Sequence, residues 1–132
     1  DLTQVQIAWT QAFCLNSSLD FAEIAQMAMD RMQILPPWLF SIDRTTGEFG
    51  TCCCNSLTLG IVHERYPFPA LWWMLEKIEN SDSDEHIRIL EAFIKLFPTA
   101  AMRYLCSNHE FAGQRWLRYL LLEPAMPFRL RI

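Results

Sequence analysis

Cysteine and histidine side chains are the groups in this sequence whose types could hold a metal ion. Zinc takes four thiolate or imidazole ligands in a tetrahedral set. The candidate ligands are Cys52, Cys54, His63, Cys106 and His109. Their spacing matches no zinc-finger pattern, and the contiguous cysteines at 52–54 suit no ordinary disulfide framework. We therefore expect free thiols in a cytoplasmic or otherwise intracellular protein, with no cofactor.

Arg103 and His109 form the pair whose spacing could support catalysis. Histidine can act as a general acid or base, and arginine can stabilise the charge that develops on a phosphate during its cleavage. An arginine followed by a histidine after a short gap in a helical domain resembles the ribonuclease motif of HEPN domains. The resemblance covers these two residues and implies RNA cleavage by an all-helical protein.

Helix capping accounts for the same pair without catalysis, because Asn108 is a favoured residue at a helix start. Neither Cys14 nor Cys106 comes with an identifiable base and oxyanion donor, and the four glycines are scattered rather than gathered in a phosphate-binding loop. We therefore expect no catalytic residues and treat the ribonuclease as an alternative to a binding function.

A protein-binding surface is the function that the sequence favours. Trp73 falls on the charged side of an expected helix, and exposed aromatic residues beside charges are typical of protein interfaces. Acidic residues at a helix junction and arginines near the C-terminus complete the candidate surface. The candidate binding residues are Trp73, Glu76, Lys77, Asp82, Asp84, Arg115 and Arg118. They predict a non-catalytic interaction, adaptor or regulatory module that binds another protein or a second copy of itself.

The distribution of charge leaves nucleic acid as a second possible partner. The net charge of −4 argues against binding of phosphate over the whole surface, but residues 98–132 hold five arginines and two acids. An RNA-binding or other nucleic-acid-binding domain would use Arg115, Arg118, Arg129 and Arg131. Residues 98–132 therefore keep this alternative open.

The elements that would position these residues are mainly helices. Apolar residues recur at helical spacing over 2–13, 20–35, 57–65, 69–78, 84–97 and 108–123, and a short helical segment is expected at 99–107. Residues 38–54 alternate and predict a small β-hairpin or a long loop. The sequence thus predicts an all-α compact bundle of about six or seven helices, with a fragment of an α-solenoid as the alternative.

The whole chain of 132 residues has the length and the 52% apolar content of one domain, residues 1–132, which could be excised from a longer protein. Its longest apolar runs fall short of the roughly 18 residues that span a bilayer. We therefore expect no membrane partner.

Overall fold

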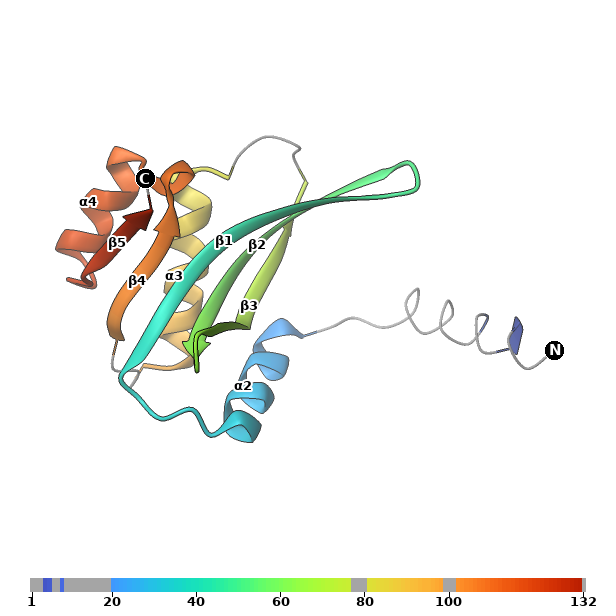
Figure 1. Ribbon diagram of the computed structural model, residues 1–132, viewed down its shortest axis with the longest axis horizontal. Helices are drawn as coiled ribbons and strands as arrows, with labels where there is room; N and C mark the ends of the chain where they lie inside the picture. The colour runs from blue at the N-terminus through green and yellow to red at the C-terminus, as the bar shows by residue number, and fades with distance from the viewer. Residues whose placement is uncertain (1–3, 6–7, 9–19, 77–80, 99–101, 132) are drawn as a thin grey trace.

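A five-stranded β-sheet forms the centre of the computed structural model, which describes residues 4–5, 8, 20–76, 81–98 and 102–131 (Figure 1). The elements, in chain order, are α2 (Phe21–Met32), β1 (Trp38–Phe49), β2 (Cys52–His63), β3 (Tyr66–Leu75), α3 (Ser83–Leu96), β4 (Met102–Asn108), the 3-10 helix η1 (His109–Phe111), α4 (Gln114–Leu122) and β5 (Phe128–Arg131). The strand order is β3-β2-β1-β4-β5. β1, β2 and β3 pair antiparallel, whereas β4 is parallel to both β1 and β5.

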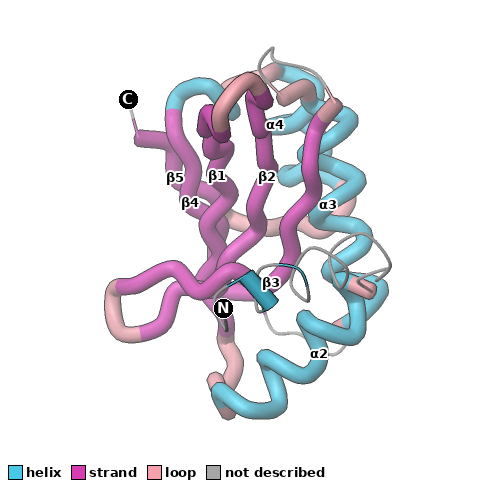
Figure 2. Tube along the Cα trace, turned by 90° about the vertical axis from the view of Figure 1, so that its right-hand side faces the viewer, coloured by secondary structure: helices cyan, strands magenta, loops and turns pink. Residues whose placement is uncertain are grey.

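The helices α3 and α4 lie on one side of the sheet, and α2 lies against the outer strand β3 (Figure 2). Side chains alternate along β1, so Phe40 and Ile42 are buried while Asp43 and Thr45 are exposed. The helix-facing side chains of the strands meet those of α3 and α4 in one core, around Phe93 and Trp116. The opposite face of the sheet, called here the open face, is not covered by any described helix.

The prediction of an all-α bundle, and with it the description as a helical bundle, is wrong. The structure is mixed α/β, with three α-helices and a five-stranded sheet among the described residues. Residues 57–65 were expected to form a helix but belong largely to β2, where Leu57, Leu59 and Ile61 are all fully buried. A helix would place residues 57 and 59 on nearly opposite sides, whereas a strand places them on one face. The recurrence of apolar residues at every second position therefore identifies this segment as a strand.

Two further expected helices are strands. The segment 69–78 contributes to β3, an outer strand of the sheet, where Pro67 and Pro69 are tolerated because one edge needs no hydrogen-bond donors. The segment 99–107 contains most of β4, whose central residue Leu105 is fully buried next to Phe40 of β1. Pairing with neighbouring strands therefore overrode the local helical spacing in both segments.

Helices with clear start signals agree with the expected segments. Asp20 caps α2 by accepting hydrogen bonds from the backbone N–H groups of Ala22 and Glu23. Asp82 caps α3 in a reciprocal capping box with Glu85. The start of the last helix was misplaced, since α4 is capped at Gly113 and not at Asn108. The expected helix at 2–13 falls almost entirely outside the described residues.

The expected hairpin is present and much longer than predicted. β1 and β2 pair from Phe40 and Ile61 to Phe49 and Cys52, and the hairpin runs out past the rest of the sheet (Figure 1).

No helix of the described segments is long and apolar enough to cross a membrane.

The sheet predicts a sharp difference between two neighbouring residues of β2. Leu59→Ala should lower the free energy of unfolding by about 2–5 kcal/mol because it removes a fully buried side chain. Thr58→Ala on the open face should cost less than about 1 kcal/mol. Urea unfolding of both variants gives the comparison, and equal losses would contradict the assignment of this segment as a strand.

Candidate functional site

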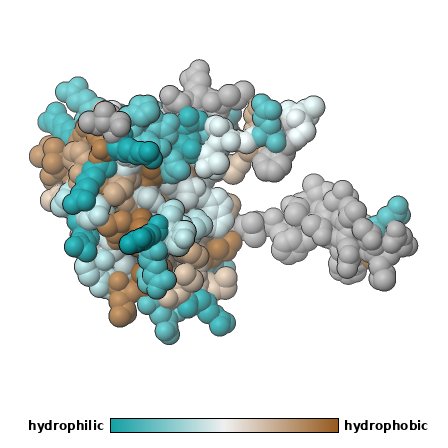
Figure 3. All heavy atoms as spheres, viewed as in Figure 1, coloured by the Kyte–Doolittle hydropathy of each residue, from teal (hydrophilic) through white to brown (hydrophobic). Residues whose placement is uncertain are grey.

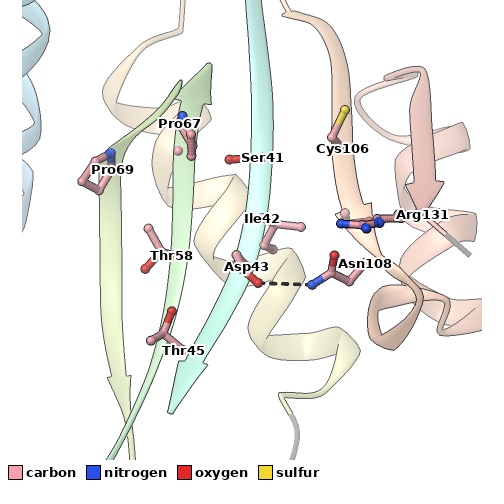
Figure 4. Close-up of a pocket in the computed structure, with 12 residues that line it drawn as sticks. Ser41, Ile42, Asp43, Thr45, Thr58, Pro67, Pro69, Cys106, Asn108 and Arg131 are labelled. Atoms are coloured by element: carbon pink, nitrogen blue, oxygen red, sulfur yellow. Dashed lines mark hydrogen bonds between the residues drawn. The ribbon is translucent and has the colours of Figure 1, made fainter. Parts of the chain in front are cut away.

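A groove on the open face is the candidate site. It has a volume of about 360 Å³ and draws residues from all five strands. Its lining is mostly polar or small: Ser41, Ile42, Asp43, Thr45, Thr58, Gly60, Pro67, Pro69, Cys106, Ser107, Asn108 and Arg131. Figure 4 shows Asp43 and Asn108 turned toward each other in this groove. Such a concave site with a few converging polar groups is the expected form of a ligand site.

Asp43 and Asn108 meet because β1 and β4 are adjacent and parallel. Asp43 lies two residues after Ser41, the last β1 residue that pairs with β4, and Asn108 lies two residues after Cys106, the partner of Ser41. The two side chains therefore lie beside each other on the open face, where the parallel pairing of β1 with β4 ends. The Asn108 amide nitrogen donates to Asp43 Oδ1 over 3.4 Å, and the backbone N–H of Arg44 donates to the same oxygen over 2.9 Å. Both hydrogen bonds orient the Asp43 carboxylate.

An ion pair beneath the groove fixes the backbone on both sides of it. Arg44 points to the helix side of the sheet and places its Nη2 atom 3.3 Å from Glu110 Oε2 in η1. The two side chains are only 16% and 22% exposed, so solvent screens this pair less than a surface pair. The contact joins the residue after Asp43 to the turn that follows Asn108.

Gly60 leaves room for the groove floor. A Cβ atom at this position would lie 3.1 Å from Ser41 Oγ and 3.1 Å from the Phe68 carbonyl oxygen. These contacts are tighter than ordinary van der Waals contacts, and the Phe68 carbonyl belongs to backbone that cannot easily move. Any larger side chain at position 60 would therefore narrow the groove.

β5 supplies positive charge at one side of the groove. Arg131 lines it and is the register partner of Asn108. Arg129, two residues earlier on the same face, lies over the ring of Tyr104 with its Cζ atom 4.6 Å from the ring centroid. The space-filling view of the open face shows hydrophilic residues interspersed with hydrophobic ones (Figure 3). The groove thus combines one carboxylate with two nearby guanidinium groups.

The candidate metal ligands of the sequence do not come together. Cys54 and His63 both lie on β2, nine residues and therefore about 30 Å apart. Cys106 lies on β4 within the groove, His109 lies in η1, and the side chain of Cys52 is outside the described part. Among the described residues, no group of three or more His, Cys, Asp or Glu side chains could hold a metal ion.

Arg103 and His109 lie at opposite ends of β4. Arg103 is near the start of the strand, and His109 follows its last residue. Six residues of extended chain separate them by about 20 Å. The all-helical frame that the HEPN resemblance implies is absent, so the two side chains do not share a site.

The candidate protein-binding residues are spread around the molecule. Trp73, expected to be exposed, is half-buried against the core, at a hollow that also contacts Phe21 of α2 and Lys95 of α3. Glu76 follows β3 and lines a second, polar hollow beside Trp73. Asp82 is the cap of α3, and Lys77 is outside the described residues. The expected acidic junction is thus partly used for helix capping.

Asp84, Arg115 and Arg118 gather on the helix side of the molecule. Asp84 of α3 and Arg115 of α4 form an exposed ion pair, with Oδ1 2.7 Å from Nη2. Arg118, one turn along α4, lines a hollow of about 630 Å³ between α3 and α4 with Glu91 and Tyr119. The structure therefore separates Arg115 and Arg118 from Arg129 and Arg131, which the sequence grouped together.

Sequence reasoning missed Asp43 and Asn108. A signal was available, because each polar residue stands where an apolar, alternating segment ends. The expected helix at 99–107 hid this signal for Asn108, since the residue was then explained as a helix cap.

No protein-family model matches this chain, and no curated protein matches it. Solved structures match through the fold. A chain of the simian T-cell lymphotropic virus intasome in complex with PP2A regulatory subunit B56 gamma aligns with a TM-score of 0.56 and 13% identity, over 75% of this chain and 36% of that chain. The present chain therefore spans about a third of that chain.

The HTLV-2 integrase catalytic core domain in complex with magnesium, in its dimeric and trimeric forms, aligns with a TM-score of 0.48 and 12% identity. The alignments cover 74% of this chain and 62% of the integrase chain. At such low identity, the likeness to the intasome chain concerns the fold alone.

Tyr119 provides a titration test of the α3–α4 surface. Burial, and then the carboxylates of Glu91 and Glu123, raise the pKa of Tyr119 from 10.0 to about 12. Between pH 10 and about 12, the folded chain therefore holds a Tyr119 proton that the unfolded chain has lost. With respect to this group, the free energy of unfolding is highest below pH 10 and falls as the pH rises through the folded-state pKa. Glu91→Gln should move the Tyr119 pKa back toward 10.0. Ultraviolet titration, with Tyr119→Phe subtracted, measures the shift, and an unchanged value in Glu91→Gln would contradict it.

Proposed function

We propose that this chain is a non-catalytic nucleic-acid-binding domain that holds a single strand across the open face of its sheet. The observation that supports this function is the presence of Arg131, Asp43 and Asn108 in one groove on that face. Single-strand-binding proteins combine a positively charged groove with aromatic residues near the strand. Both features are present beside β5 in this protein.

The phosphates would lie along β5. Arg129 and Arg131 are exposed, are two residues apart and project to the same face of the sheet. Arginine binds phosphate oxygens through paired N–H donors. Hydroxyl groups of Thr45 and Thr58 in the same groove are further donors of the kind that contact phosphate and sugar oxygens.

The bases would lie toward β1. The Asp43 carboxylate can accept hydrogen bonds from the exocyclic amino groups of bases, and the Asn108 amide can donate and accept. Tyr104 lies beside the groove under the Arg129 guanidinium, and bases stack on both aromatic rings and guanidinium planes. A carboxylate would repel a phosphate, so Asp43 fits the base side of the strand better than the backbone side.

The total charge of −4 does not oppose this assignment, because the charge close to the groove is positive although the whole chain is acidic. The exposed acids Asp84 and Glu91 belong to α3 and lie on the helix side. Around the groove the charged residues are Asp43, Arg129 and Arg131. The proposal includes an intracellular location, where nucleic acid is available and the free thiols of Cys53, Cys54 and Cys106 stay reduced.

Binding of another protein, as an interaction or regulatory module, is the second candidate. It is favoured by the hollow between α2, β3 and α3, whose lining includes the partly exposed apolar side chains of Phe21 and Trp73. Aromatic residues in such hollows are frequent anchors of protein interfaces. Lys95 at the same hollow would favour an acidic partner segment.

The nucleic-acid proposal makes a prediction with matched arginines. Arg129→Ala and Arg131→Ala should each weaken binding to single-stranded DNA or RNA and reduce the slope of log affinity against log salt by about 0.7. Arg115→Ala and Arg118→Ala, on the opposite side of the sheet, should leave both unchanged. Fluorescence anisotropy with a labelled oligonucleotide, repeated over a salt series, measures these quantities.

Equal effects of all four arginine variants would show that binding is general charge attraction and would reject the groove. Thr58→Val adds a variant without any change of charge, because it replaces a hydroxyl group that lines the groove by a methyl group of similar size. Its oligonucleotide affinity should fall while circular dichroism still reports the folded sheet.

The protein-binding candidate has a separate test. Lys95→Glu reverses the charge at the rim of the Trp73 hollow without removing a buried side chain. It should abolish recovery of acidic partners from the source cell, whereas Glu91→Lys elsewhere on α3 should not. Unchanged recovery with Lys95→Glu would remove the hollow as a docking site.

A further inference from the structure

The surface between α3 and α4 lies on the side of the molecule opposite the groove (Figure 2). Its hollow of about 630 Å³ is lined by Ile87 and Glu91 from α3 and by Arg118, Tyr119 and Leu122 from α4, among others. Residues 118 and 119 each lie three or four positions from both 115 and 122, so the four residues share one face of α4. This surface has no role in the proposed binding of nucleic acid.

An apolar centre is the first property of this surface. Leu122 is 65% exposed and lines the hollow together with the half-buried Ile87 and Tyr119. Exposed leucines grouped with an aromatic ring are typical of surfaces that become covered by a partner.

Charges of both signs at the edge are the second property. Glu91 and Glu123 carry negative charge, and Arg115 and Arg118 carry positive charge, all around the same hollow. Arg115 is already paired with Asp84 in the same chain. Arg118 makes no ion pair with any described residue, which leaves its guanidinium for a partner's carboxylate.

We propose that the α3–α4 surface binds the same surface of a second copy of this chain. In a two-fold interface a residue away from the axis meets a different residue of the other copy, and that contact occurs twice. A patch that contains acids and bases around an apolar centre can therefore complement itself. An acidic or a basic partner would instead meet like charges over half of the surface.

Two adjacent leucines of α4 provide the first test. Leu122→Asp should raise the dissociation constant of the dimer by about tenfold or more, because it places a charge at the apolar centre. Leu121→Asp is the matched control, since Leu121 is 61% exposed but does not line the hollow. Analytical ultracentrifugation at several protein concentrations measures both constants.

Complementary charge reversals provide the second test. Arg118→Glu and Glu91→Lys should each weaken association of the variant with itself, because like charges then face each other across the two-fold axis. An equimolar mixture of the two variants should associate again, since each copy now supplies the charge that the other lacks. Differently labelled variants allow the mixed dimer to be measured directly.

A wild-type chain that stays monomeric at low salt and at its highest soluble concentration would overturn the proposal. Equal effects of Leu121→Asp and Leu122→Asp, or no recovery of association in the mixture, would also overturn the proposal for this surface. The affinity of a single groove for an oligonucleotide should be the same in Leu122→Asp as in the wild type, because Leu122 does not line the groove. A failure of the dimer proposal and a failure of the nucleic-acid proposal are therefore distinguishable.

Discussion

The alternation of side chains along β1 is the constraint on which the rest of the structure depends. This strand pairs antiparallel with β2 on one side and parallel with β4 on the other. Phe40 and Ile42 enter the core, so the residues between and after them, Ser41 and Asp43, must face the open side. A shift of register by one residue would bury the carboxylate and expose the isoleucine. The core and the groove are therefore two results of the same pairing.

The sheet also acts as a partition between two chemical surfaces. The open side carries hydroxyl groups, Asp43, Asn108 and the arginines of β5. The helix side carries the Asp84–Arg115 ion pair and the mixed charges around Leu122. Because the two surfaces share no side chain, each can bind its own partner without displacing the other. A dimer formed through the helices would leave both grooves facing outward.

The predictions from sequence succeeded where the signals were local. Asp20 and Asp82 mark helix starts by hydrogen bonds within a few residues, and those hydrogen bonds are present in α2 and α3. The sheet was missed because its stability comes from pairing between distant segments, as when Leu105 packs next to Phe40. The groove could not be predicted once β4 was taken for a helix, since only two parallel strands bring Asp43 and Asn108 together. Arg131 was found by its charge, but its place beside Asn108 depends on the pairing of β4 with β5.

Gly60 couples the width of the groove to the pairing of the strands. The position is fully inside the β1–β2–β3 ladder, yet its own missing side chain is what leaves space next to Ser41. Leu59 and Ile61, the neighbours of Gly60 in the sequence, are fully buried on the helix side, so β2 cannot easily move away from a side chain added at position 60. A single methyl group at position 60 would reach the groove and the Phe68 backbone at once, so the breadth of the ligand site can change here only together with the pairing of β2 and β3.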